Sequence, residues 1–469
     1  MIIMSDGKFL WRHVSTVVSL ALVCTVHAQT AEVVIDFDKT SGPVKPVNGV
    51  GQPPMIGALG NWSMMPYLKE AGIPYSRLHD VGGWLGGGLY VDIPNLFPDF
   101  AADENDPSSY RFAYTDSLLN ALVANGVEPY FRLGVTIENF AGNGYPPLRI
   151  APPKDFAKWA RICEHVIRHY TEAWANGYRH ANSHWEIWNE PDNMPTISEQ
   201  PMWRAPFAEY VRLYGVTAKH LKAKFPHLKI GGYGSSGFYG VGSSWGKNDP
   251  ARMNHFMDCF TNFLYRARAE NMPLDFFSFH FYDRPAFLVR QMAYCRRTLD
   301  EYGFKNAEMS LNEWHTGGGI DALGTSRQAA DIASVLLLLQ NGPVSDAEIY
   351  DARCDVGGYS PLFNPLTCKP HKAYYAFTAF NELRKRGTAV AVQVSGNNRL
   401  YVAAAGGELD SAIMMANDSD EPAPFVCNLH GRTVMSCRIT DSNRTDVVIP
   451  FPTELPPCSF LVAILSPQK

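Results

Sequence analysis

The chain has 469 residues, of which 46% are hydrophobic, 12% aromatic and 19% charged, and its formal net charge is −5 at pH 7. This slight acidic excess argues against a nucleic-acid-binding protein, because neutralising phosphates requires a clustered excess of basic residues. The low charge and plentiful apolar residues also exclude an extensively disordered chain. The composition gives no indication of the oligomeric state.

The first 28 residues have the pattern of a secretory signal peptide. Lys8 and Arg12 form a basic start, Val14 to Val26 is almost uncharged, and Ala28 ends a small-x-small cleavage site. A single transmembrane anchor is the alternative, but about 13 apolar residues fall short of the roughly 20 that a spanning helix needs. We therefore expect a secreted or periplasmic protein without a membrane span.

From about residue 48 to 385, short β-rich runs alternate with longer amphipathic patterns, which is typical of repeated βα units around a parallel sheet. The predicted helices include Asp155 to Trp174, Phe207 to Lys224, Asn254 to Arg268 and Ser326 to Gln340. The eight predicted strands are Gly49 to Gly51, Tyr75 to Leu78, Glu128 to Leu133, His184 to Trp188, Leu228 to Gly231, Phe276 to Phe279, Glu308 to Leu311 and Ala347 to Tyr350.

Eight such units predict an α/β fold, a (β/α)8 TIM barrel with insertions. A doubly wound open sheet is the main rival, but no G-x-G-x-x-G motif follows an early strand. The ends of the chain differ from the barrel region. Ala31 to Asp38 alternates like a strand, and the chain after Gly387 consists of short β-rich runs separated by turn residues. We therefore predict a signal peptide at 1–28, a catalytic barrel at 29–386 and an accessory C-terminal β-sandwich at 387–469, with which the N-terminal strand could pair.

Eight cysteines follow the leader, and none lies in a C-x-x-C arrangement, so the sequence predicts no metal site. Export would permit disulfides. The pairs Cys354/Cys368 and Cys427/Cys437 are close enough along the chain to be plausible, although spacing leaves the connectivity open.

The residues able to do chemistry follow the predicted strands. In a barrel of this kind the active site forms at the C-terminal ends of the strands. Glu190 ends the fourth strand and Glu313 ends the seventh, so both carboxylates should point into one pocket. Glycoside cleavage requires such a pair, one to protonate the leaving oxygen and one to attack or stabilise the anomeric carbon. Each glutamate taken alone would more often be a solvated or salt-bridged residue.

Neighbouring strand ends supply further polar groups. Asn189 is placed to hold the hydroxyl next to the reacting carbon, and Arg77 to keep Glu313 ionised. His280 or Tyr282 could orient the nucleophile or the sugar. Aromatic side chains can also stack on sugar faces, and the predicted positions put Trp188, Tyr282 and Trp314 beside the carboxylates. Either tryptophan taken alone would more often belong to the core.

The sequence also resembles a known family. Trp185 to Asp192 (WEIWNEPD) resembles the fourth-strand motif of clan A retaining glycoside hydrolases, most closely family 39, the β-xylosidase and α-L-iduronidase family. Tyr75 to His79 (YSRLH), Phe279 to Tyr282 (FHFY) and Leu311 to Trp314 (LNEW) are similar to its second, sixth and nucleophile strands. The resemblance covers about residues 31 to 385.

The resemblance implies that Glu190 is the general acid/base and Glu313 the nucleophile of a retaining exo-glycosidase, with an oligosaccharide or polysaccharide as substrate and no cofactor. Asn189 would bind the 2-hydroxyl. The remaining substrate-binding residues would be His79, His280, Tyr282 and Trp314. The default substrate is a β-D-xyloside. An arabinosidase, galactosidase or iduronidase-like enzyme is the alternative, and a carbohydrate-binding pseudoenzyme is a further one.

Two segments depart from the xylosidase pattern, and both are expected to shape the sugar pockets. They are the glycine-rich run Gly82 to Gly88 after the second strand and Tyr350 to Asp355 after the eighth. Specificity could therefore have moved within the family. Arg353 could read the carboxylate of a uronic acid, but pairing with Asp351 or Asp355 is the favoured interpretation.

Overall fold

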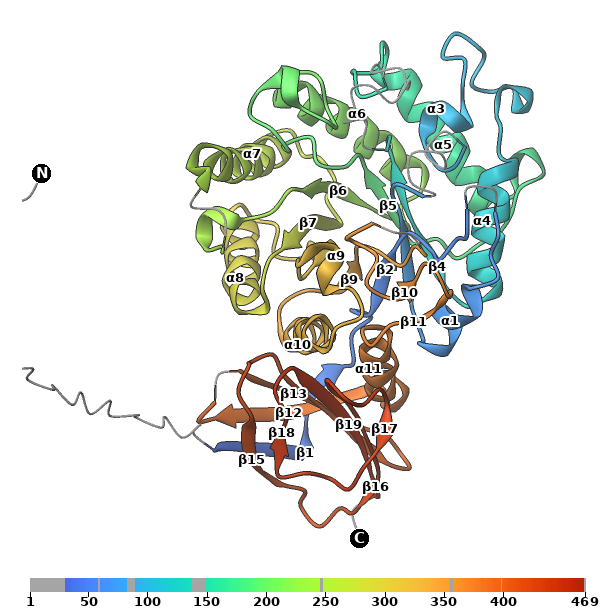
Figure 1. The fold of residues 1–469 in the computed structure, drawn as a ribbon. Helices are drawn as coiled ribbons and strands as arrows, with labels where there is room; N and C mark the ends of the chain where they lie inside the picture. The colour runs from blue at the N-terminus through green and yellow to red at the C-terminus, as the bar shows by residue number, and fades with distance from the viewer. Residues whose placement is uncertain are drawn as a thin grey trace, which may run out of the picture.

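The computed structural model describes residues 30–57, 60–81, 89–136, 149–244, 248–354, 357–397 and 399–467. Two parts are evident in Figure 1, a barrel wrapped by helices and a β-rich part that holds both the first described strand and the C-terminal strands. The predicted signal peptide and the loop Gly82 to Gly88 lie outside the described residues.

Eight parallel strands form the closed barrel in chain order, which confirms the predicted TIM-barrel fold. Closure is made by the first strand, in which Val50 pairs with Ser76 on one side and with Ile349 on the other. The barrel strands are β2 (Gly49–Gly51), β3 (Tyr75–Leu78), β4 (Glu128–Leu133), β5 (His184–Ile187), β6 (Lys229–Ser235), β7 (Phe276–Tyr282), β8 (Glu308–His315) and β9 (Asp346–Ile349).

Three barrel strands run three or four residues further than the sequence predicted. β6, β7 and β8 end at Ser235, Tyr282 and His315, so the polar residues expected after these strands lie inside them. The pairing of β7 with β8 shifts register after Ser278, and beyond that bulge His280 pairs with Glu313. A bulge bends a strand and changes the direction of its side chains. Polar residues can therefore remain within these strands instead of marking their ends.

Helices pack around the barrel, and one of them begins four residues earlier than predicted. Asp249 caps that helix by accepting from the Arg252 backbone N–H, and Pro250 occupies its first position, where no amide donor is needed. The helices are α1 (Met65–Glu70), α3 (Ile93–Leu96), α4 (Ala113–Ala124), α5 (Phe156–Thr171), α6 (Phe207–Lys224), α7 (Pro250–Ala269), α8 (Pro285–Glu301), α9 (Gly319–Ala322), α10 (Ser326–Asn341) and α11 (Tyr374–Arg386).

The accessory part is a single hydrogen-bonded sheet of nine strands in the order β17-β16-β19-β14-β13-β12-β1-β15-β18. The N-terminal strand lies within it, antiparallel to β12 and parallel to β15. The strands are β1 (Ala31–Pro43), β12 (Thr388–Ser395), β13 (Leu400–Gly406), β14 (Ser411–Asn417), β15 (Ala423–Asn428), β16 (Val434–Thr440), β17 (Val447–Val448), β18 (Glu454–Leu455) and β19 (Ser459–Leu465). A small hairpin of β10 (Phe363–Asn364) and β11 (Lys369–Pro370) lies between β9 and α11.

Strand β14 is buried on both faces, in keeping with the unbroken apolar run between its terminal Ser411 and Asn417. Ile413 and Met415 point into the core enclosed by the nine-stranded sheet. Ala412 and Met414 belong instead to the core shared with the barrel helices, and α10 and α11 lie between the two parts in Figure 1. The two parts therefore bury apolar surface against each other.

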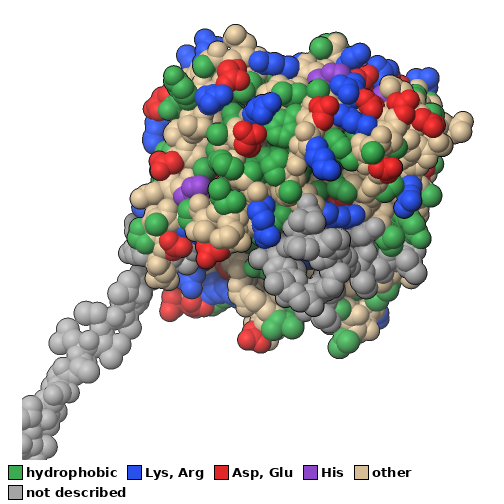
Figure 2. Space-filling model, turned by 90° about the horizontal axis from the view of Figure 1, so that it is seen from above, with side chains coloured by type: hydrophobic (Ala, Val, Ile, Leu, Met, Phe, Trp, Pro, Cys, Tyr) green, Lys and Arg blue, Asp and Glu red, His purple; other side chains and the backbone are tan. Residues whose placement is uncertain are grey.

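On the face seen in Figure 2, Lys and Arg side chains are interspersed with Asp and Glu. Within the described residues, no helix has the length and apolar character needed to cross a membrane. The sulfur atoms of Cys354 and Cys368, one of the plausible disulfide pairs, lie 3.8 Å apart.

Candidate active site

The two predicted catalytic glutamates converge at the C-terminal end of the barrel. Glu190 follows β5 and Glu313 lies in β8 beyond the bulge, and their exposed fractions are only 7% and 4%. A carboxylate oxygen of Glu190, a carboxylate oxygen of Glu313 and a ring nitrogen of His280 all lie within 4.8 Å of one another. The pair is therefore close, buried and bridged by an imidazole.

Glu313 receives two donors. The Arg77 Nη1 group donates to Glu313 Oε2 at 2.9 Å, and the Tyr282 hydroxyl donates to Oε1. Burial raises the pKa of the Glu313 carboxyl, while the Arg77 charge and the Tyr282 hydroxyl oppose that rise. Both donors favour the ionised form, which is the form a nucleophile needs.

Glu190 lies in a different environment. Its Oε1 is 2.7 Å from His280 Nδ1, and its Oε2 accepts from the Asn193 amide at 2.5 Å. Burial raises the pKa of Glu190 to about 7, although Asn193 opposes the rise. The pKa of His280 is lowered, chiefly by burial, so this imidazole is a neutral partner. Glu190 is therefore the carboxyl better able to carry a proton near neutral pH.

The turn after β5 places Glu190 in the pocket. Trp188 and Glu190 both have left-handed backbones, with φ of 75° and 41°. The Glu190 backbone N–H donates to the Gly234 carbonyl at 2.9 Å, which ties the turn to β6. Non-glycine residues rarely adopt such φ values, and their clustering at functional sites is a known trend.

Arg77 connects three acceptors. Besides Glu313, it donates through Nε to Glu186 at 2.8 Å and through Nη2 to Asn189 at 2.5 Å. Because a guanidinium only donates, the Asn189 oxygen must face Arg77, which turns the Asn189 amino group away. That amino group is buried and has no hydrogen-bond partner among the described residues. It is therefore available for a ligand hydroxyl.

Sequence reasoning missed Glu186, which is fully buried. It also accepts hydrogen bonds from the Ser278 hydroxyl and the Asn312 amide, each at 2.6 Å. The sequence did contain a signal for Glu186. Parallel barrel strands are mostly apolar, so a charged residue at an inward position of such a strand stands out.

The remaining predicted substrate-binding residues carry buried polar atoms. Both ring nitrogens of His79 and the Trp314 Nε1 lack hydrogen-bond partners within the described chain. Burial, together with Arg132 and Arg77, holds the pKa of His79 well below its usual value, so its ring is neutral. Trp314 is fully buried, so its ring offers no open face on which a sugar could stack. Its indole N–H is the group that remains for a ligand contact.

Trp188 does not lie at the pocket mouth as expected. Its indole N–H donates to the Met202 carbonyl at 2.8 Å, and its ring packs between Trp159 and Trp203. Among the described residues, an exposed ring near Glu190 and Glu313 is instead that of Tyr359, which is 48% exposed and lies edge-on to Tyr282 at 5.7 Å. No motif marks Tyr359 in the sequence, since a loop brings it there.

Arg353 pairs with Asp351, as the favoured interpretation held. Its Nη2 and Nε lie 2.7 Å and 2.8 Å from Asp351 Oδ2. Asp355, the other candidate partner, lies outside the described residues. Asp80 adds a further carboxylate here, and its Oδ2 accepts from the Tyr350 hydroxyl at 2.9 Å.

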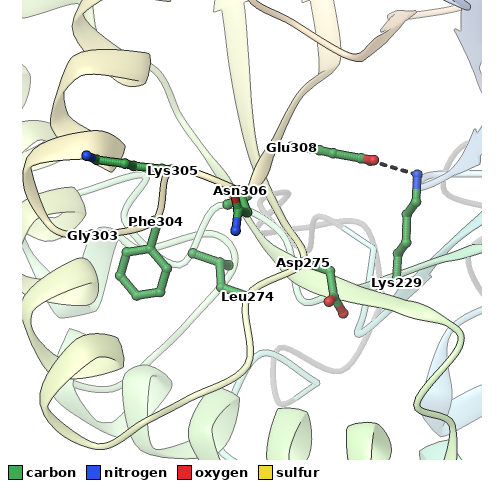
Figure 3. Close-up of a pocket in the computed structure, with 9 residues that line it drawn as sticks. Lys229, Leu274, Asp275, Gly303, Phe304, Lys305, Asn306 and Glu308 are labelled. Atoms are coloured by element: carbon green, nitrogen blue, oxygen red, sulfur yellow. Dashed lines mark hydrogen bonds and ion pairs between the residues drawn. The ribbon is translucent and has the colours of Figure 1, made fainter.

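A second cluster with metal-ligand chemistry lies at the opposite, N-terminal end of the barrel. It comprises His184, Glu308 and Asp346. Lys229 supplies positive charge there, with its Nζ 2.7 Å from Glu308 Oε2. These two side chains line a pocket of about 550 Å³, shown in Figure 3. The paired glutamates that glycoside cleavage needs lie at the other end of the barrel.

The sequence profile of glycosyl hydrolases family 39 matches residues 61–302, just over half of the chain. The chain belongs to this family. A β-xylosidase of Geobacillus stearothermophilus is 25% identical over 338 residues, a match that covers 64% of this chain and 61% of that enzyme. The match thus spans less than two thirds of the relative's length.

Two solved structures share the fold of this family 39 chain. A glucosidase from Croceicoccus marinus has a TM-score of 0.72 at 19% identity and covers 94% of this chain and 100% of its own. A monomeric β-xylosidase from Caulobacter crescentus has a TM-score of 0.65 at 16% identity, covering 93% and 99%.

Proposed function

We propose that this chain is a retaining, exo-acting glycoside hydrolase that removes terminal sugars by double displacement, with β-D-xylosides as the default substrate. The observation that carries the proposal is the buried pair of Glu190 and Glu313, with oxygens within 4.8 Å. Retaining enzymes hold the two carboxyl groups about 5–5.5 Å apart, whereas inverting enzymes need about 6.5–9.5 Å to admit water.

In the first step, Glu313 attacks the anomeric carbon while protonated Glu190 gives its proton to the leaving oxygen. The donors on Glu313 hold it ionised, and burial keeps a proton on Glu190 near neutral pH. In the second step, Glu190 takes a proton from water, which displaces Glu313 and restores the original configuration. The Asn189 amino group would hold the neighbouring hydroxyl through both steps.

The charge of the pocket supports a neutral terminal sugar. Arg77 and Arg353 are each paired with buried carboxylates, and Asp80 adds negative charge. A uronic acid would bring a further carboxylate into the pocket, and neither arginine would be left unpaired to bind it. We therefore rank an arabinosidase or galactosidase above an iduronidase-like enzyme as the alternative. A panel of nitrophenyl glycosides tests the ranking, and preferred cleavage of a uronide would overturn it.

Removing each carboxylate in the presence of azide tests the roles. Glu313→Ala should lose activity and, with azide, release a glycosyl azide of inverted configuration. Glu190→Ala should give the azide with retained configuration. Glu308→Gln is a matched control, because Glu308 starts the strand that carries Glu313 but lies at the other end of the barrel. Exchanged configurations would reverse the roles.

The same variants test the non-catalytic alternative, a carbohydrate-binding protein built on an inactive barrel. If wild type and both variants bind sugars equally and none hydrolyses aryl glycosides, the enzyme proposal fails.

We also propose that the chain is exported and that residues 1–28 are removed, on the basis of the leader pattern alone. N-terminal sequencing of protein recovered from an exporting host tests this, and an intact Met1 would contradict it.

A further inference from the structure

Asn193 lies between the acid/base glutamate and an arginine from the first turn of α7. Its Nδ2 donates to Glu190 Oε2 at 2.5 Å. Arg252 donates through Nη2 to Asn193 Oδ1 at 3.0 Å and through Nε to the Asn193 carbonyl at 2.9 Å. The Arg252 guanidinium itself lies over the Phe256 ring, 5.3 Å from its centroid. Asn193 is thus held from both sides.

The arginine settles which way the Asn193 amide faces. A guanidinium donates hydrogen bonds and accepts none, so the Asn193 oxygen must face Arg252 and its amino group must face Glu190. Glu190 Oε2 therefore has a fixed donor, and Glu190 Oε1 has His280 Nδ1 at 2.7 Å. With a fixed neighbour on each oxygen, the carboxyl plane of Glu190 cannot rotate freely.

We propose that Asn193, fixed by Arg252, is a positioning residue that orients Glu190 for proton transfer to the leaving group. The inference rests on the proposed function, in which Glu190 is the acid/base. General-acid catalysis depends on the donor lying within hydrogen-bond reach of the oxygen that it protonates. A glutamate free to turn would spend part of its time with the proton directed elsewhere.

The same contacts bear on the pH dependence. The amide donor and the positive charge of Arg252 both stabilise the Glu190 carboxylate and so oppose the rise in its pKa that burial causes. Loss of either should raise that pKa further and move the basic limb of kcat/KM to higher pH. The charged and titratable groups around Glu190 are Arg77, Asp80, Asp192, Tyr239, Arg252, His280, Tyr282 and Glu313.

Leaving-group dependence separates positioning from a general structural role. The 2,4-dinitrophenolate leaving group departs without protonation, whereas the leaving group of a phenyl glycoside of the same sugar must be protonated by the acid. Asn193→Ala and Arg252→Met should lower kcat/KM about tenfold for the phenyl glycoside, as expected on losing one hydrogen bond to a carboxyl that becomes charged as its proton leaves. For the dinitrophenyl glycoside, kcat/KM should change less than twofold. Arg266→Met, on the same helix, is the matched control and should change neither.

Asn193→Asp is a second test. It keeps the size of the side chain nearly constant and replaces the hydrogen-bond donor to Glu190 with an acceptor. The same selective loss is expected. An equal loss on both substrates, or no loss on either, in folded Asn193 variants overturns the inference. Glu190→Ala is measured on the same pair of substrates. If it shows no leaving-group selectivity, the proposed function itself fails; if it does and the Asn193 variants do not, only the positioning role fails.

Discussion

Replacing Glu186 by glutamine should move the acidic limb of kcat/KM to lower pH. Arg77 divides its positive charge between Glu186 and Glu313, at 2.8 Å and 2.9 Å. Glutamine keeps the size of the side chain and removes one negative charge. The guanidinium would then stabilise the Glu313 carboxylate more strongly, and a like charge near Glu313 would disappear. Both effects lower the pKa of Glu313, which must be ionised to attack.

The magnitude follows from the geometry. Two carboxylates on opposite sides of one guanidinium are roughly 7 Å apart, and unit charges at that distance interact by about 2 kcal/mol at an effective dielectric constant of about 20. One pKa unit corresponds to about 1.4 kcal/mol, so the limb should shift by about 1–2 pH units. Activity at the optimum should also fall, because a less basic carboxylate is a weaker nucleophile.

The assay is the pH profile of kcat/KM for an aryl glycoside, with circular dichroism to confirm that the variant is folded. Glu209→Gln is the matched control, because the Glu209 side chain is 44% exposed and forms a surface ion pair with Arg212 at 3.6 Å. Such pairs contribute about 0–1 kcal/mol. An acidic limb that stays in place or rises in folded Glu186→Gln would refute the idea that Arg77 shares its charge.

Three further outcomes are expected. Tyr282→Phe removes a donor from Glu313, so the acidic limb should move to higher pH and kcat/KM should fall about tenfold; an unchanged limb would contradict this. The ion-pair partners of Glu308 lower the pKa of its carboxyl from 4.5 to about 2. Wild type should therefore melt at a higher temperature than Glu308→Gln above about pH 4.5, and this difference should vanish as the pH falls towards 2. Met414→Ala should cost about 2–5 kcal/mol in thermal unfolding, whereas Met435→Ala, at a 56% exposed position, should change little.

The strand pattern was predictable because short β-rich runs alternate with longer amphipathic helical patterns along the barrel region. All eight predicted strands exist, and β2, β3 and β4 have the predicted bounds. The ends of β6, β7 and β8 were wrong by three or four residues, because bulges allow polar residues such as His280 and Tyr282 to stay in the sheet. Local sequence signals do not reveal a bulge, since it depends on the neighbouring strand.

Sequence patterns were enough to predict the barrel and the convergence of Glu190 and Glu313 at one of its ends. Alternation of strand and helix patterns indicates a parallel sheet, eight such units favour a barrel, and a barrel brings the C-terminal strand ends together. Those features depend on residues near one another in the chain.

Other groups around the carboxyls, Glu186 and Asn193 among them, became evident only in the folded chain. Arg77 reaches Glu186, and Asn193 meets Arg252 across 59 positions of sequence. The same packing moved Trp188 into the core and brought Tyr359 beside Tyr282. The physical reason is that hydrogen bonds and burial set the pKa and orientation of a carboxyl, and both come from side chains that the fold, not the local sequence, places around it.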